Sequence, residues 1–176
     1  MRSVLALGSH VPSIAESVFV APGALILGRV TLGSDSSVWY HAVLRGDVVA
    51  IRIGARVNIQ EHAMVHGNSG GPDVVVGDDV TIGHRAIVHG ATLGERVLIG
   101  MGAIVLDGAL LEDECLVGAG ALVTGGFHAP AGSLVLGSPA RVARPLREEE
   151  RAALRMSALH YVDNARLHRS AWESAT

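Results

Sequence analysis

The chain has 176 residues, enough for one domain with an appendage. Hydrophobic residues make up 49% of it but aromatic residues only 3%, which suits a narrow core without rings, and its 22 glycines suit repeated tight corners. The formal net charge is −3 and all 14 basic residues are arginine, so the chain offers neither a concentrated basic surface for nucleic acid nor a catalytic lysine.

The beginning of the chain, residues 1–9, contains too short an apolar run for a signal peptide, and no later stretch is long enough to cross a bilayer. The single cysteine, Cys115, has no partner within the chain, which suits a structural thiol in a reducing compartment. These features predict a cytoplasmic protein that associates with neither membrane nor nucleic acid.

A six-residue repeat of aliphatic side chains begins at Ile14. Its runs cover residues 14–44, 53–65, 76–82 and, after one five-residue step to Ile87, 87–123. A period of six fits neither an α-helix nor the alternation of a strand. It predicts an all-β solenoid, a β-helix in which each repeat supplies one short strand and one corner. Three repeats make a coil of about 18 residues, so residues 14–126 predict roughly six coils.

The repeat ends at residues 137–141, and a different pattern follows Pro145. Residues 147 to about 169 predict one amphipathic helix, whose acidic first turn suits the helix dipole. Its predicted apolar stripe consists of Ala152, Met156, Leu159, Val162 and Ala165. We expect Met156 and Leu159 to pack against the solenoid or a neighbouring subunit. The predicted boundaries are a solenoid domain over 1–145 and a C-terminal helix over 146–176.

Three histidines, His66, His84 and His89, interrupt the repeat where imidazole contributes nothing to it. Imidazole is the commonest zinc ligand, and three ligands leave a fourth position for water or substrate. Once the loop 67–73 is set aside, His66 and His89 are one coil apart and should stack on nearly the same face, whereas His84 belongs to the preceding face. Two adjacent subunits would therefore bring all three together more readily than one coil. The alternative is three unrelated surface histidines.

Further polar side chains crowd the first half of the solenoid. They are Arg45, Asp47, Asn58, Gln60 and Glu61. Arg45 and Asp47, two apart on a strand edge, point the same way and could pair or position an oxyanion. The amide of Gln60 can hold water or a small substrate without titrating. The alternative is a set of stacked polar corners that satisfy only one another.

Several stretches together resemble the gamma-class carbonic anhydrases and their close relatives. They are residues 38–47 (VWYHAVLRGD), residues 52–61 (RIGARVNIQE), Gly83-His84, His89-Gly90 and residues 98–108 (LIGMGAIVLDG). The similarity covers most of residues 9–145. It implies a left-handed parallel β-helix with a C-terminal helix, in a homotrimer with a metal between subunits. His66 and His89 would come from one subunit and His84 from the next.

The resemblance also implies a chemistry. Three imidazoles would hold zinc, or alternatively iron or cobalt, and metal-bound hydroxide would attack carbon dioxide to give bicarbonate. Arg45 and Asp47 would form a structural pair at the subunit contact, and Gln60 would lie beside the metal-bound water. The same neighbourhood would include Asn58, Glu61 and, from the final helix, Tyr161 or Asn164.

The chain departs from the family prototype where that protein carries glutamates for proton transfer. The corresponding residues 48–50 read VVA, and the loop 67–73 is short. Glu61 is the nearby carboxylate that could substitute. Three other functions stay open: a hexapeptide-repeat acyltransferase that uses one histidine as general base on a CoA thioester, a metal-dependent thioesterase at the same site, and a non-catalytic trimer that keeps its metal for structure.

Overall fold

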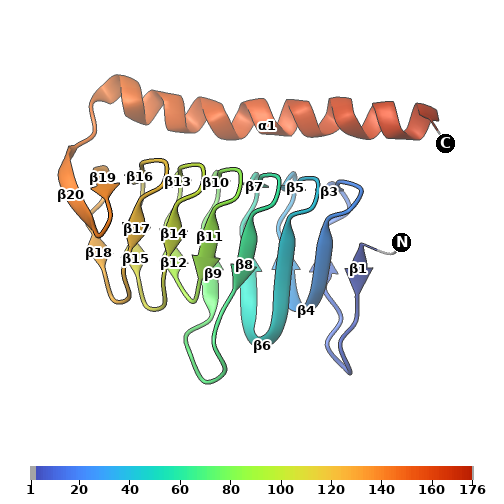
Figure 1. Cartoon of the computed structure of the whole chain (residues 1–176). Helices are drawn as coiled ribbons and strands as arrows, with labels where there is room; N and C mark the ends of the chain where they lie inside the picture. Colours follow the sequence, from blue (N-terminus) through green and yellow to red (C-terminus); the bar gives the residue numbers. More distant parts are fainter. Residues whose placement is uncertain (1–2, 176) are drawn as a thin grey trace.

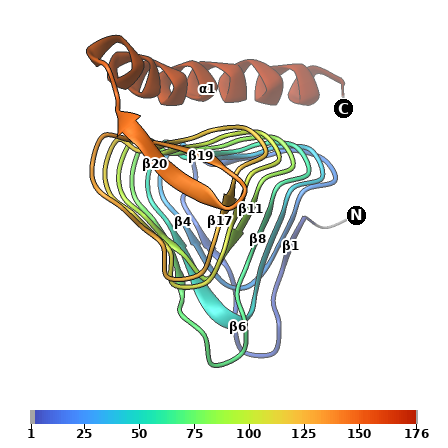
Figure 2. The ribbon, with the colours of Figure 1, turned by 60° about the vertical axis from the view of Figure 1, so that its left-hand side comes forward.

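The computed structural model describes residues 3–175 as a three-sided parallel β-solenoid with one long helix along it (Figures 1 and 2). The predicted fold is confirmed, because about seven coils and a single C-terminal helix match a left-handed hexapeptide-repeat β-helix. The seventh coil arises because stacking continues past residue 126 into β18 and β19. No helix in the described part of the chain combines the length and apolarity that a membrane crossing needs.

Three faces make up the solenoid. The helix face, which lies beneath the helix, carries β3 (Phe19–Val20), β5 (Ser37–Val38), β7 (Asn58–Ile59), β10 (Thr81–Ile82), β13 (Leu98–Ile99), β16 (Leu116–Val117) and β19 (Ser133–Gly137). The histidine face carries β8 (Met64–His66), β11 (Ile87–His89), β14 (Ile104–Val105) and β17 (Leu122–Val123). The third face carries β2 (Ser13–Ile14), β9 (Val74–Val76), β12 (Thr92–Leu93), β15 (Leu110–Leu111) and β18 (His128–Ala129).

Two long strands, β4 (Leu25–Leu32) and β6 (Val43–Ile53), continue from the histidine face into the third face and join both into one twelve-stranded sheet. At the two ends of the stack, β1 (Val4–Leu5) pairs with β4, and β20 (Ala140–Pro145) pairs antiparallel with β19. The antiparallel turn ends the stack of coils and directs the chain toward the helix.

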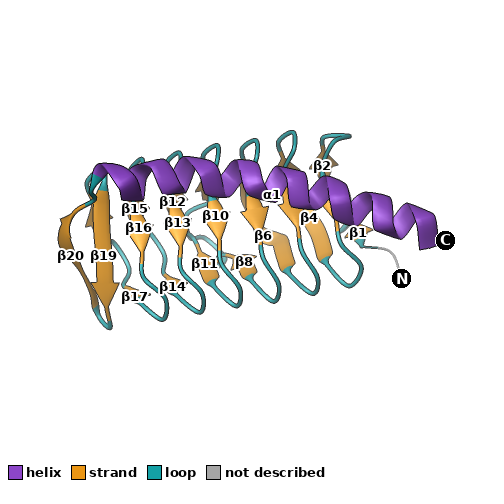
Figure 3. Ribbon diagram, turned by 90° about the horizontal axis from the view of Figure 1, so that it is seen from above, coloured by secondary structure: helices purple, strands orange, loops and turns teal. Residues whose placement is uncertain are grey.

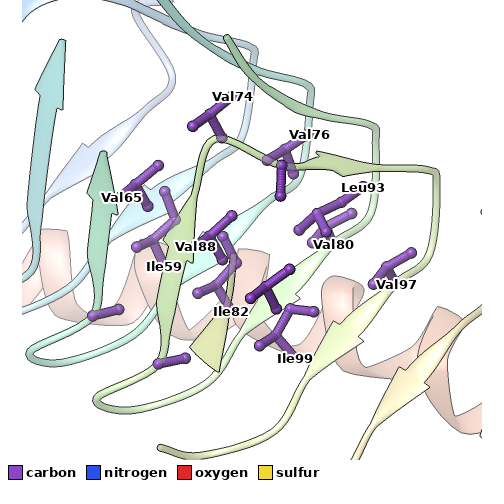
Figure 4. Packing of buried hydrophobic residues seen from close by; sticks show 14 of the residues in the cluster. Ile59, Val65, Val74, Val76, Val80, Ile82, Val88, Leu93, Val97 and Ile99 are labelled. Atoms are coloured by element: carbon purple, nitrogen blue, oxygen red, sulfur yellow. The ribbon is translucent and has the colours of Figure 1, made fainter. Parts of the chain in front are cut away.

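The core is a set of columns of aliphatic side chains, one column for each face (Figure 4). On the helix face, Ile59, Ile82 and Ile99 are fully buried and stack in register. Each fully buried aliphatic side chain contributes about 1.5–3 kcal/mol, and because every coil covers the next, the columns hold the coils together. Cys115 is also buried, and burial raises the pKa of its thiol, so it serves as a small core side chain.

At one position of the repeat, the predicted inward-pointing residue is wrong. Ile87 points outward, and the inward residue of β11 is Val88, which is fully buried. The five-residue step lies between Val88 and Leu93, where Gly90 adopts a positive φ of 55°. Because neighbouring strand residues point to opposite sides, this phase turns His89 outward together with Ile87.

The helix α1 (Glu148–Ala175) has the predicted acidic first turn and extends beyond the predicted end near residue 169. It runs along the length of the solenoid (Figure 3), and its 28 residues span about 42 Å. Glu114 on the solenoid forms ion pairs with Arg151 and Arg155 of the helix and with Arg96 of the solenoid. The hydrogen bond from Arg155 helps to hold the pKa of that carboxyl below its usual value.

The predicted apolar stripe of α1 is partly wrong. Val162 and Ala165 are buried as expected, but Met156 and Leu159 are 64% and 50% exposed in the single chain. The buried stripe is Leu154, Ala158, Val162 and Ala165. These residues are spaced four, four and three apart, so they lie on one face of the helix, and this face packs against the solenoid. Met156 and Leu159 lie outside this face. Whether a neighbouring subunit covers Met156 and Leu159 stays a prediction.

A pair of variants measures this packing. Leu154→Ala should lower the free energy of unfolding by about 2–4 kcal/mol, because it leaves a cavity between helix and solenoid. Met156→Ala is the matched control and should change it by less than about 0.5 kcal/mol. Denaturant unfolding of both variants provides the measurement. A loss for Met156→Ala as large as that for Leu154→Ala would instead show that the assembled protein buries Met156.

Candidate metal centre

Two of the three histidines lie side by side on the histidine face. β8 and β11 pair so that His66 is directly opposite His89, and the two rings meet edge to face with their centres 5.2 Å apart. Their side chains are 12% and 21% exposed. The expectation that these two residues stack on one face is confirmed, because Val65 and Val88 point inward directly before them.

The third histidine, His84, follows β10 at the corner between the helix face and the histidine face. Its Nδ1 lies 2.7 Å from Oε2 of Glu61, and its backbone N–H donates to Oε1 of Gln60 at 3.1 Å. Its side chain is 42% exposed. The histidine lines a hollow at the edge of the helix together with Gln60, Ser157 and Tyr161.

A single chain does not gather the three histidines. Within residues 3–175 of one chain, no group of three His, Cys, Asp or Glu side chains is placed to hold a metal ion. His66 and His89 form one half of a candidate centre on the histidine face, and His84 forms the other half at the corner. Within the described part of one chain, His84 therefore stands apart from the pair formed by His66 and His89.

The hydrogen-bond partners of the ring nitrogens indicate which histidines could bind a metal ion without rearrangement. His89 directs Nδ1 at the carboxylate of Asp107, which only accepts hydrogen bonds, so Nδ1 donates and the neutral ring presents Nε2 to an ion. Nδ1 of His84 similarly lies 2.7 Å from a carboxylate oxygen of Glu61. A carboxylate behind a histidine in this way is typical of metal ligands. His66 differs, because its Nε2 donates to Asp47 at 2.9 Å and its Nδ1 accepts from Arg45 at 3.1 Å. It must release one of these partners to bind an ion.

The predicted contact between Arg45 and Asp47 is present as a close ion pair on β6. Burial opposes ionisation of Asp47, but hydrogen bonds from Arg45 and His66 outweigh it and hold the pKa of Asp47 below its usual value. Asp47 therefore stays ionised at neutral pH, and together with Arg45 it fixes His66 from one side. Their assignment to a subunit contact stays a prediction.

A row of polar side chains, half-buried at Ser157 and buried at the other members, leads from the helix to the hollow. Ser157 on α1 contacts the hydroxyl of Thr81 at 3.1 Å, Asn58 donates to Thr81 at 2.9 Å, and Gln60 donates to Oδ1 of Asn58 at 3.0 Å. Gln60 is 5% exposed and also accepts from the backbone of His84. The amide of Gln60 is thus held in one orientation. Asn58 contributes to the site by fixing Gln60.

Of the two helix residues considered for the site, Tyr161 lines the hollow. Burial raises the pKa of Tyr161, and the negative charge of nearby Glu61 raises it further. Its ring packs edge-on against Trp39, with centres 5.6 Å apart. Asn164, the other residue considered for this place, instead contacts His160 at 3.0 Å.

Two polar residues beside His89 were not among the predicted site residues. Asp107 lies 2.5 Å from Nδ1 of His89, and Asn68 donates to the other oxygen of Asp107 at 2.7 Å. Asp107 follows His89 by 18 residues, one more than the offset of 17 between paired residues of β11 and β14, so a count of the repeat alone does not place it beside His89.

The outward side of the histidine face is also unusually apolar. Neighbouring strands align one column of partly buried aliphatic side chains, which we call the aliphatic column: Leu25, Val43, Met64, Ile87, Ile104 and Leu122. A hollow beside His89 is lined by Ile87, Ile104 and Leu106. A contiguous apolar strip next to polar ligands is typical of a protein–protein contact.

Comparison with known proteins identifies the family. A model of the hexapeptide repeat of succinyl-transferase matches residues 73–107 and 91–125. A probable carbonic anhydrase of Methanocaldococcus jannaschii is 49% identical over 85% of this chain and 93% of its own length. The mitochondrial gamma carbonic anhydrase 1 of Arabidopsis thaliana is 41% identical over 95% of this chain and 62% of its own length. The chain belongs to the gamma-class carbonic anhydrase-like family.

A solved structure similar to this gamma-class carbonic anhydrase-like protein carries a different name. The hexapeptide transferase family protein from Anaplasma phagocytophilum is 41% identical, covers 94% of this chain and 98% of its own, and superposes with a TM-score of 0.90. The shared scaffold therefore appears under both carbonic anhydrase and transferase names, and the residues of the site must decide between the two chemistries.

Proposed function

We propose that this protein is a cytoplasmic, metal-dependent carbonic anhydrase that interconverts carbon dioxide and bicarbonate at sites shared between the subunits of a homotrimer. The observation that carries the proposal is the division of the three histidines, with His66 and His89 paired on one face and His84 at a separate corner. The aliphatic column beside the paired histidines supplies an apolar surface for the neighbouring subunit. The name of the Methanocaldococcus relative supports the same reaction.

The proposed ion is zinc, with iron or cobalt as alternatives, held by His66 and His89 of one subunit and His84 of the next. Nε2 of His84 and of His89 are oriented for this role by their carboxylate partners. His66 would exchange its contact with Asp47 for the ion, which leaves Asp47 to its pair with Arg45. When bound, the ion would supply a Lewis acid that lowers the pKa of water from 15.7 to about 7.

The polar residues of the hollow would orient substrate and accept the proton. Gln60 is anchored by Asn58 on one side and by the backbone of His84 on the other, so its remaining hydrogen-bonding positions have a fixed direction. Carbon dioxide is small and uncharged, and a fixed amide can orient it without competing for the ion. Glu61, whose Oε2 lies 2.7 Å from Nδ1 of His84, is the proposed proton acceptor.

The test of this proposal is metal analysis followed by stopped-flow carbon dioxide hydration on protein purified without chelator. We expect about one metal per chain and a hydration rate that disappears on metal removal and returns on reloading. A metal-loaded trimer without measurable hydration would contradict the enzymatic proposal and favour a metal that only stabilises the assembly.

Acyl transfer or metal-dependent hydrolysis of a CoA thioester is the second candidate. The name of the Anaplasma structure, at 41% identity, favours it. The same metal-loaded preparation should therefore be tested with acetyl-CoA, alone and with an acceptor amine. Turnover of the thioester in the absence of hydration would replace carbon dioxide by an acyl thioester as the substrate.

Gln60 provides a specific prediction for the hydration reaction. Gln60→Ala should leave the metal content unchanged and lower the hydration rate by about 10- to 100-fold, because a fixed polar contact to the reacting group is lost. Ser157→Ala, which removes only the far end of the same polar row, is the matched control and should keep most of the rate. A Gln60→Ala protein with the wild-type rate would remove the amide from the mechanism.

A further inference from the structure

We infer that Asp107 is the positioning residue of His89, and that Asn68 from the loop 67–73 holds Asp107 in this role. The inference rests on the proposed function, since it assigns His89 as a metal ligand. It adds two residues that neither the sequence patterns nor the family resemblance assigned to the site.

The first step is the hydrogen bond itself. Oδ1 of Asp107 lies 2.5 Å from Nδ1 of His89, and the ring nitrogen must donate because a carboxylate only accepts. This contact fixes both the proton and the rotation of the ring, and it leaves Nε2 as the free nitrogen. His66 differs from His89, because its Nε2 donates a hydrogen bond to Asp47. Asp107 thus occupies Nδ1 of His89, and a metal ion could bind the other ring nitrogen, Nε2.

The second step is the support of the carboxylate. Asn68 donates from Nδ2 to Oδ2 of Asp107 at 2.7 Å, so each oxygen of Asp107 has its own partner. Asn68 belongs to the loop 67–73, the segment that interrupts the six-residue repeat between β8 and β9 and protrudes from the solenoid (Figure 1). The loop therefore has a specific contact with the candidate centre, 39 residues along the chain from Asp107.

The third step is the space that the carboxylate occupies. A Cβ atom at Gly90 would lie 2.4 Å from Oδ1 and 3.0 Å from Cγ of Asp107. The short five-residue step after Val88 places Gly90 there with a positive φ, which a side chain rarely adopts. The irregular step in the repeat thus provides room for the carboxylate directly behind His89.

The test compares Asp107→Ala, Asp107→Asn and Asn68→Ala in the assembled protein. Zinc affinity, measured by competition with a chromogenic chelator, should weaken about 10- to 100-fold for Asp107→Ala. Asp107→Asn keeps an acceptor oxygen and should recover part of that loss, and Asn68→Ala should lose less than Asp107→Ala. Glu112→Ala is the matched control, because it removes a carboxylate from His128 on the third face, where the contact is 2.7 Å. This control should keep the wild-type affinity.

A second readout needs no metal. Nitrogen-15 NMR of metal-free protein should show the His89 ring protonated at Nδ1 in the wild type, and a mixture of tautomers in Asp107→Ala. Unchanged zinc affinity together with an unchanged tautomer would overturn the inference and leave the proposed function standing. A wild-type protein that binds no zinc would overturn the proposed function, while the tautomer would still test the contact between Asp107 and His89.

Discussion

His84→Ala should reduce carbon dioxide hydration to the uncatalysed background and lower the zinc content, while the chain keeps its fold. His84 lies at a corner with a 42% exposed side chain, so its removal leaves no cavity in the core. It does remove one of three proposed ligands, and no other histidine of the same half of the centre replaces it. Circular dichroism, elemental analysis and stopped-flow hydration measure the three effects.

Mixed trimers make this prediction specific to a centre shared between subunits. A His84→Ala chain still supplies His66 and His89, and a His89→Ala chain still supplies His84. When the two are co-expressed with different tags and purified through both, each mixed trimer should contain one intact centre and recover about one third of the wild-type rate. Both parent variants alone should stay inactive.

The matched control mixes His66→Ala with His89→Ala. These residues belong to the same half of the centre, so no arrangement of the two chains restores an intact set, and the mixed trimers should stay inactive. Activity in this control, or none in the His84→Ala and His89→Ala mixture, would contradict the proposed division of ligands.

Much of the fold is predictable from the sequence because a six-residue aliphatic period has few packing solutions. An inward residue every six positions requires three short strands per coil, and parallel stacking then buries each coil on the next. The pairing of His66 with His89 follows from the same count, because a full coil separates them. The repeat therefore locates one half of the centre before any coordinates are known.

The errors arise where hydrophobicity alone cannot choose a side. Ile87 and Val88 are both aliphatic and adjacent, and only the positive φ at Gly90 settles which of them points inward. The helix is similar, since Leu154 and Met156 are both apolar and only two residues apart, yet Leu154 is buried and Met156 is exposed. Asp107 was missed because its contact with His89 depends on the corner that Gly90 forms.

Replacing Val88 with aspartate should therefore have a different outcome from replacing its neighbour Ile87 on β11. Val88→Asp places a carboxylate in a fully buried column, where an unpaired charge costs several kcal/mol. Because domains of this size are stable by about 5–15 kcal/mol and each coil depends on its neighbours, we expect little or no folded protein. Soluble yield and far-ultraviolet circular dichroism measure the loss.

Ile87→Asp should instead leave each chain folded and weaken its association. Ile87 points outward within the aliphatic column, so water can solvate the new carboxylate in the free chain, whereas a neighbouring subunit would have to bury it. Light scattering should show a mass below that of the proposed wild-type trimer, and zinc content should fall with it because the proposed shared centres would no longer be complete. Ile87→Val, which keeps an aliphatic side chain, should retain both. A trimeric Ile87→Asp protein would mean that this part of the histidine face faces solvent, and the aliphatic column would then no longer support the shared centre.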